Sequence, residues 1–312
     1  MQNTLSRGVY TVVVTPFLEN NKVDYDSISR IITNQINKGI SGLVLLGTTS
    51  ESPTLSMVEK LEIVKFVSTY YGGKFEIIVG IGGNNTVETI NFGKMIKNQV
   101  NGFMVTVPNY NKPSQLGIYN HFTTIANTFS DVPIMMYNIP SRCGVNMTPD
   151  TVKNIYYNCE NVVAIKEASG SLEQAIKIKS LCDINIFSGD DSLILPILAI
   201  GGVGVISVAS NILPWEISYI VSQFNNNIDL SRKLYFKFHN FIKALFVTTN
   251  PVPVKYFLSK LELINNDIVR LPLVKCPKLE ITMKSIEDFL KECQKEKHLG
   301  GKVEHITCPM VI

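Results

Sequence analysis

One lysine stands inside an otherwise apolar stretch of the chain. Lys166 follows Val162–Ile165, a run typical of a buried strand. Burial lowers the pKa of a lysine because an ammonium ion is costly to remove from water, and the neutral amine can attack a ketone to form a Schiff base. The alternative is a strand-end lysine that reaches solvent or pairs with Glu167. Successive strand residues face opposite sides, so we expect Glu167 to point toward the helices.

Other polar side chains stand where apolar runs end. Tyr110 and Tyr137 carry hydroxyls that can move protons, although each can equally be a core aromatic with a satisfied hydroxyl. Thr48 and Thr49 can hold a carboxylate with their amides and hydroxyls, or only cap a following helix. Arg142 can grip a carboxylate with two parallel hydrogen bonds, or be a solvated loop charge. If the functional alternatives hold, the set could bind carboxylates and attack a carbonyl.

The predicted strands and helices that must position these residues form a repeating pattern. Apolar runs alternate with amphipathic segments at a spacing of roughly 25–30 residues, the size of a βα unit. The eight predicted strands are Val9–Pro16, Gly42–Gly47, Glu76–Gly82, Gly102–Pro108, Val132–Ile139, Val162–Ala168, Asn185–Gly189 and Gly204–Val208. Eight such units predict an α/β fold, a (β/α)8 TIM barrel with its chemistry at the carboxyl ends of the strands. A doubly wound open sheet is the alternative, but no G-x-G-x-x-G turn follows the first strand.

The βα rhythm stops after about residue 228. Three helical patterns follow, at Leu230–Val247, Pro253–Leu263 and Met283–Lys297. We therefore predict a catalytic barrel over residues 1–228, a C-terminal all-helical appendage over 229–299 and a tail over 300–312 with no assigned function.

Composition excludes several classes of protein. The 312 residues are 45% hydrophobic and 18% charged, which excludes a disordered chain. The net charge of +3 gives no reason to expect nucleic acid or an anionic membrane as a partner. The uncharged run Ser192–Ser210 approaches the length of a membrane span, but Pro196 and three glycines favour a buried helix–turn–strand unit. Six cysteines and four histidines are too scattered for a metal motif, so we expect no metal or cofactor, reduced thiols and a cytoplasmic protein without a signal peptide.

Six motifs in a fixed order carry a family resemblance. They are Gly47-Thr48-Thr49-Ser50-Glu51-Ser52-Pro53-Thr54-Leu55, Tyr137-Asn138-Ile139-Pro140-Ser141-Arg142-Cys143-Gly144, Lys166-Glu167-Ala168-Ser169-Gly170, Ser188-Gly189-Asp190-Asp191, Gly204-Val205-Ile206-Ser207 and Asn250-Pro251-Val252-Pro253-Val254-Lys255. Over about residues 8–275, the chain resembles the dihydrodipicolinate synthase / N-acetylneuraminate lyase family of class I, Schiff-base aldolases.

The resemblance implies roles for the polar residues. Lys166 would form the Schiff base with pyruvate, and Tyr137 would shuttle protons. Thr49 and Tyr110 would complete a hydroxyl relay, with Tyr110 reaching in from a neighbouring subunit. Thr48 and Thr49 would hold the pyruvate carboxylate. The enzyme would be a homo-oligomer, at least a dimer and a tetramer built from two tight dimers.

Arg142 separates the subfamilies. By resemblance, the main chains of Gly189 and Ile206 would line the pocket near the lysine, and Arg142 would bind the carboxylate of the second substrate. The Ser-Arg pair and Thr48 point to the synthases, which condense pyruvate with L-aspartate 4-semialdehyde to 4-hydroxy-tetrahydrodipicolinate in lysine and diaminopimelate biosynthesis. The alternatives are a pyruvate-dependent aldolase for a sugar acid, and a non-catalytic barrel that only binds.

Three residues depart from the family pattern. Ser50 replaces a glycine, which would cost about 1 kcal/mol if that position needs a positive φ. Cys143 replaces a common threonine, and Asn109 a common tyrosine. In lysine-inhibited relatives, lysine binds a cleft that would here be lined by Pro53, Met57, Lys60, Asn84, Glu88 and Asn109. Because an aromatic and a histidine are missing from it, we expect weak or absent inhibition by lysine.

Overall fold

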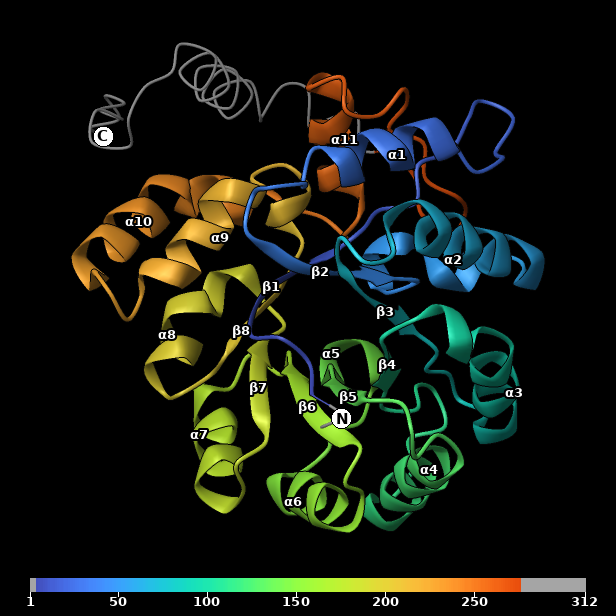
Figure 1. Cartoon of the computed structure of the whole chain (residues 1–312), viewed down its shortest axis with the longest axis vertical. Helices are drawn as coiled ribbons and strands as arrows, with labels where there is room; N and C mark the ends of the chain where they lie inside the picture. The colour runs from blue at the N-terminus through green and yellow to red at the C-terminus, as the bar shows by residue number, and fades with distance from the viewer. Residues whose placement is uncertain (1–3, 276–312) are drawn as a thin grey trace.

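The computed structural model describes residues 4–275 and contains a closed barrel of eight parallel strands. Each strand pairs with the next, and the last pairs with the first (Figure 1). The strands are β1 (Gly8–Val12), β2 (Ile40–Leu45), β3 (Glu76–Gly80), β4 (Gly102–Thr106), β5 (Ile134–Asn138), β6 (Val162–Glu167), β7 (Asn185–Ser188) and β8 (Gly204–Ser207). The predicted TIM barrel is confirmed, and its strands are shorter than predicted at their carboxyl ends because the chain there leaves the barrel for loops.

Helices surround the barrel and connect its strands (Figure 1). They are α1 (Tyr25–Thr33), α2 (Met57–Tyr71), α3 (Thr86–Ile96), α4 (Gln115–Thr128), α5 (Pro140–Cys143), α6 (Pro149–Asn158), α7 (Leu172–Leu181), α8 (Ile194–Ala199), α9 (Pro214–Gln223), α10 (Ile228–Ala244) and α11 (Val252–Lys260). Polar caps fix where several of them begin. Ser56 and Glu59 form a capping box at the start of α2, and the Ser171 side chain accepts the Gln174 amide at the start of α7.

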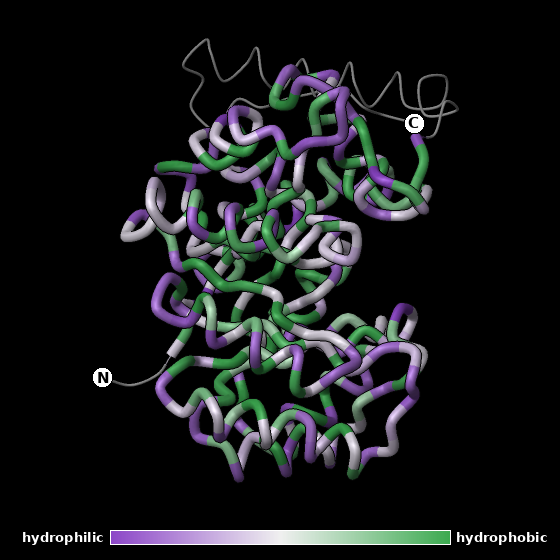
Figure 2. Tube along the Cα trace, turned by 90° about the vertical axis from the view of Figure 1, so that its right-hand side faces the viewer, coloured by the Kyte–Doolittle hydropathy of each residue, from purple (hydrophilic) through white to green (hydrophobic). Residues whose placement is uncertain are grey.

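The apolar core has two parts. Alternate strand residues fill the barrel interior, among them Tyr10, Met104 and Phe187. The remaining strand residues pack against the helices. Figure 2 shows hydrophobic stretches through the middle of the molecule and hydrophilic ones on many outer turns. Both faces of each strand are therefore covered, which explains the continuous apolar runs in the sequence.

The region after the barrel is helical as far as α11. Helix α10 packs against α9, and Arg30 of α1 donates to the carbonyl of Leu263, just after α11, at 3.4 Å. The division at residue 228 stays a prediction, and Met283–Lys297 and residues 300–312 lie outside the described residues. The run Ser192–Ser210 contains α8, a turn and β8, so the predicted helix–turn–strand unit is confirmed. Among residues 4–275, no helix is long and apolar enough to cross a membrane.

Candidate active site

Lys166 and Tyr137 face each other inside the barrel. They are direct partners in the register of β5 and β6. Lys166 Nζ lies 4.2 Å from the centre of the Tyr137 ring, and the two residues are 5% and 3% exposed. The next residue, Glu167, accepts a hydrogen bond from Gln174 on α7. The predicted outward direction of Glu167 is confirmed, and Lys166 is left without that carboxylate as a partner.

Burial makes Lys166 an unusual amine. Desolvation lowers its pKa from 10.5 to about 7, while the charge of Asp191 opposes this shift and that of Arg142 adds to it. Asp191 is itself buried, and burial raises the pKa of its carboxyl to about 6. Its oxygens accept hydrogen bonds from the hydroxyl of Ser207 and from the amides of Val208 and Ala209. At neutral pH, a large fraction of Lys166 is therefore the nucleophilic free base.

The two threonines of the 3₁₀ helix η1 (Thr48–Ser50) have different partners. The pKa of Tyr137 is raised to about 12, mainly by burial. A hydrogen bond with the Thr48 side chain opposes this rise. The Thr49 hydroxyl instead accepts a hydrogen bond of 2.9 Å from Asn250 Nδ2. The contacts thus place Thr48 beside the Tyr137 hydroxyl, where the resemblance had suggested Thr49.

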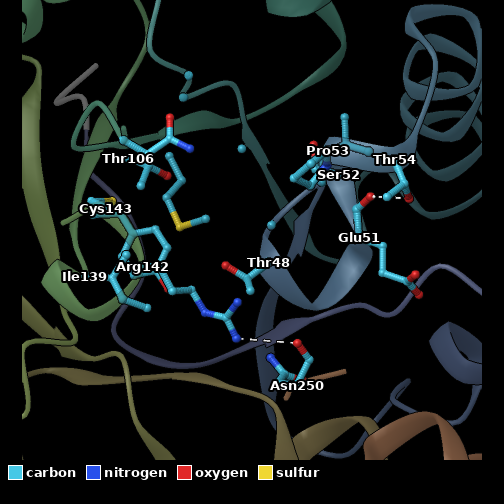
Figure 3. Close-up of a pocket in the computed structure, with 18 of the residues that line it drawn as sticks. Thr48, Glu51, Ser52, Pro53, Thr54, Thr106, Ile139, Arg142, Cys143 and Asn250 are labelled. Atoms are coloured by element: carbon cyan, nitrogen blue, oxygen red, sulfur yellow. Dashed lines mark hydrogen bonds between the residues drawn. The ribbon is translucent and has the colours of Figure 1, made fainter. Parts of the chain in front are cut away.

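A cavity of about 550 Å³ opens at the carboxyl ends of the strands. Tyr137, Thr48 and Arg142 all line it, and Figure 3 shows the Arg142 side chain extending toward Thr48 and Asn250. Arg142 lies on the short helix α5, and its Nη2 donates to the Asn250 carbonyl at 3.5 Å. Arg142 is an exposed residue in the wall of the cavity, where its guanidinium can meet a carboxylate on an entering molecule.

Tyr110, Gly189 and Ile206, also predicted as site residues, do not line this cavity. Tyr110 is 87% exposed with a φ of 66°, so within one chain its hydroxyl is not part of the cavity. Ile206 is buried in the barrel interior. The Gly189 amide donates to the Glu167 carbonyl at 2.8 Å, and a Cβ on Gly189 would lie 2.5 Å from the Cβ of Ala168. Neither Gly189 nor Ile206 lines the cavity, and Gly189 is required for close packing.

Several contributors carried no assigned role in the sequence. Asn250 contacts both Thr49 and Arg142, and its Oδ1 is buried without a hydrogen-bond partner. Glu51, at the end of η1, forms a buried ion pair with Lys255 of α11. Asn250, Glu51 and Lys255 all lie in the quoted motifs, which was the only signal for them.

The departures from the family pattern are accommodated. Glu51, and not Ser50, has the left-handed backbone, with a φ of 54°. Ser50 instead donates its hydroxyl to the Val13 carbonyl at 2.6 Å, so the strain expected at Ser50 is absent. Burial raises the pKa of the Cys143 thiol to about 11, which keeps it protonated.

The expected lysine cleft overlaps the cavity in part. The wall of the cavity includes Pro53, Lys60, Asn84 and Asn109 from the expected cleft. Met57 is 46% exposed and lies outside the cavity. Weak inhibition by lysine stays a prediction. In the described part of the chain, no three His, Cys, Asp or Glu side chains lie together as a metal site requires.

Comparisons with known proteins agree with this geometry. The model of the dihydrodipicolinate synthetase family matches residues 5–292. A protein of Endomicrobium trichonymphae named 4-hydroxy-tetrahydrodipicolinate synthase is 45% identical over 289 residues, 91% of this chain and 97% of the relative.

Solved structures agree as well. The structure of the 4-hydroxy-tetrahydrodipicolinate synthase from Methylacidiphilum fumariolicum SolV matches this chain with a TM-score of 0.89 at 38% identity. The match covers 94% of this chain and 99% of the other. A dihydrodipicolinate synthase variant described as monomeric has a TM-score of 0.86 at 37% identity, covering 94% and 97%. This chain belongs to the dihydrodipicolinate synthetase family.

Proposed function

We propose that this chain is a lyase that condenses pyruvate with L-aspartate 4-semialdehyde to 4-hydroxy-tetrahydrodipicolinate, as the names of its relatives indicate. The observation that carries the proposal is a buried lysine, with its pKa lowered to about 7, against the tyrosine that lines the cavity. Such an amine attacks a ketone at neutral pH.

The reaction follows from these positions. The Lys166 amine attacks the pyruvate ketone carbon, water leaves, and an iminium forms. Loss of a methyl proton gives an enamine, whose carbon attacks the aldehyde of the second substrate, and the new alkoxide takes a proton. The amine of the second substrate then attacks the iminium carbon, closes the ring and releases Lys166. Tyr137 would move these protons with Thr49 and Tyr110, as the resemblance implies, or with Thr48, whose side chain hydrogen-bonds Tyr137, because hydroxyls both donate and accept.

Arg142 is the proposed contact for the second substrate, because it lines the same cavity as Tyr137. Thr48 and Thr49 would hold the pyruvate carboxylate, and the main chains of Gly189 and Ile206 would support the site around the lysine. The proposal includes Tyr110 donated by a neighbouring subunit, a homo-oligomer up to a tetramer, and a cytoplasmic location.

Borohydride reduction with pyruvate tests the mechanism. We expect one reduced adduct, located on Lys166 by peptide mass spectrometry and absent from Lys166→Ala. No adduct on the parent protein would favour a non-catalytic barrel, and an adduct on another lysine would overturn the assignment.

The second substrate needs a separate assay. Arg142→Ala should keep the pyruvate adduct and lose about ten- to a hundredfold in kcat/KM for L-aspartate 4-semialdehyde, the effect of one charged hydrogen-bonding contact. Turnover with a sugar acid in place of the semialdehyde would identify the protein as the alternative aldolase.

A further inference from the structure

A buried polar cluster lies directly behind the reactive pair. Asn138 and Glu167 follow Tyr137 and Lys166 in the chain and are 0% and 4% exposed. They are also direct partners in the register of β5 and β6. Because strand residues alternate, this second pair faces the helices while the reactive pair faces the interior. Asn138 Nδ2 donates to Glu167 Oε2 at 3.1 Å and joins the two strands through their side chains.

The Glu167 carboxylate is surrounded by donors. Its Oε1 accepts the Ser169 amide at 2.7 Å, and its Oε2 also accepts Gln174 Nε2 at 3.0 Å. All three partners, including Asn138, offer N–H groups, so the site requires an acceptor at both oxygens. An amide in place of this carboxylate would turn a donor toward other donors.

The same cluster reaches the segment that carries Arg142. Asn138 Oδ1 accepts the Met147 amide at 3.0 Å, and Asn138 Nδ2 donates to Asn146 Oδ1 at 2.8 Å. Asn146 Nδ2 in turn donates to Gln174 Oε1 at 2.7 Å. One connected set of hydrogen bonds therefore fixes the ends of β5 and β6 and the chain just after α5.

We propose that Glu167 is a positioning residue for the Schiff-base reaction, acting through this cluster on Lys166, Tyr137 and Arg142. The inference rests on the proposed function. Its physical basis is that an amine and a proton-transfer hydroxyl must be held to a fraction of an ångström, and small displacements cost large factors in rate. A fully satisfied buried network provides that rigidity.

An exchange of side chains tests the proposal. In Glu167→Gln, an amide faces donors, and in Gln174→Glu, two carboxylates face each other. The double variant E167Q/Q174E restores the contact between the two positions, because the Gln side chain at 167 donates to the Glu side chain at 174, which still accepts from Asn146. The amide at 167 still faces the Asn138 Nδ2 donor, so the restoration is partial. Glu173→Gln is the matched control, since Glu173 is exposed and adjacent to the cluster but outside its hydrogen bonds.

The readouts are kcat and KM for pyruvate well below the melting temperature, together with the melting temperature itself. We expect each single variant to lose about ten- to a hundredfold in kcat with KM changed less than about threefold, and the double variant to recover part of this loss in kcat. The control should match the parent protein. Full kcat in Glu167→Gln with a lowered melting temperature would overturn the proposal, because the cluster would then only support the fold.

A folded double variant that stays as slow as Glu167→Gln would also overturn it. If Glu167→Gln fails to fold, recovery in the double variant relative to Gln174→Glu carries the test. Borohydride labelling of the parent protein separates the two hypotheses. If the parent protein is not labelled, the proposed function is refuted. If the parent protein is labelled but kcat does not recover in the double variant, only the role of Glu167 is refuted.

Discussion

The amine of Lys166 owes its reactivity to the strand that carries it. An apolar strand buried on both faces removes water from the ammonium form, and within residues 4–275 no carboxylate forms an ion pair with it. Asp191 opposes the shift without cancelling it, because burial has the larger effect on the pKa of the lysine. Burial and the charge of Asp191 together give Lys166 a pKa of about 7, so about half of it is protonated at that pH.

This balance predicts the pH dependence of adduct formation. The pKa of Lys166 is lowered to about 7, so the neutral amine dominates above pH 7 and is lost below it. The rate of borohydride-trapped adduct formation should fall about tenfold per pH unit below about pH 6 and level off above about pH 8. Single-turnover trapping over this range measures it. A rate still rising above pH 9 would mean that the lysine keeps an ordinary pKa.

The two threonines of η1 give a second prediction at this scale. Thr48→Val removes the side-chain hydroxyl beside Tyr137 and should lower kcat by about a hundredfold, the smaller end of what proton transfer contributes. Thr49→Val removes the bond to Asn250 and should cost about 1 kcal/mol of stability with a smaller loss of kcat. Steady-state kinetics and denaturation of both variants decide the assignment. A larger loss of kcat in Thr49→Val than in Thr48→Val would assign the relay role to Thr49.

At the scale of elements, charged contacts attach the segment after α11 to the barrel. Arg270 donates to Glu59 at the start of α2 and to the Thr54 carbonyl, and its own amide donates to Glu51. The Lys255 ammonium contacts Glu51 and the Ile268 carbonyl. These contacts fix the turn that follows η1, so the end of the described chain supports the threonine loop.

The Glu59–Arg270 pair predicts acid sensitivity. The hydrogen bond from Arg270 lowers the pKa of Glu59 to about 2, below its unfolded value of about 4.3. A carboxyl with a lowered folded pKa stabilises fully above the unfolded pKa and loses this contribution as pH falls toward the folded one. Glu59→Gln should therefore lower the free energy of unfolding by about 1–3 kcal/mol at pH 7.

The difference between Glu59→Gln and the parent protein should shrink as pH falls from about 4.5 toward 2. Urea denaturation at pH 7, 4.5 and 3 measures it, with Glu62→Gln, one turn along α2, as the control. An equal difference at all three pH values would show that the pair acts through packing and not through charge.

At the scale of the whole molecule, the proposed homo-oligomer makes a prediction about the exposed Tyr110. A tyrosine ring that is 87% exposed and held in a left-handed backbone leaves apolar surface that a second copy can cover. We expect light scattering at assay concentration to show at least a dimer. Tyr110→Phe should keep the assembly and lower kcat, because only the hydroxyl is removed. An active monomer would remove Tyr110 from the mechanism.

The sequence alone determined the barrel and the place of the proposed nucleophile, Lys166. Eight apolar runs alternating with helices leave few other folds, and the period-2 alternation of a strand already separates Lys166 from Glu167. Tyr137 at the end of the fifth run and Arg142 just after it were placed by the same rule. These features depend on local periodicity, which a sequence carries directly.

Only the tertiary structure decided which polar groups meet. Thr48 and Thr49 are neighbours, and their directions in a 3₁₀ turn differ by about 120°, so only the folded turn shows which one faces Tyr137. Asn250 reaches Thr49 across 201 residues, and Lys255 reaches Glu51 across 204. Such contacts arise when barrel closure brings distant segments together, and no local pattern encodes them.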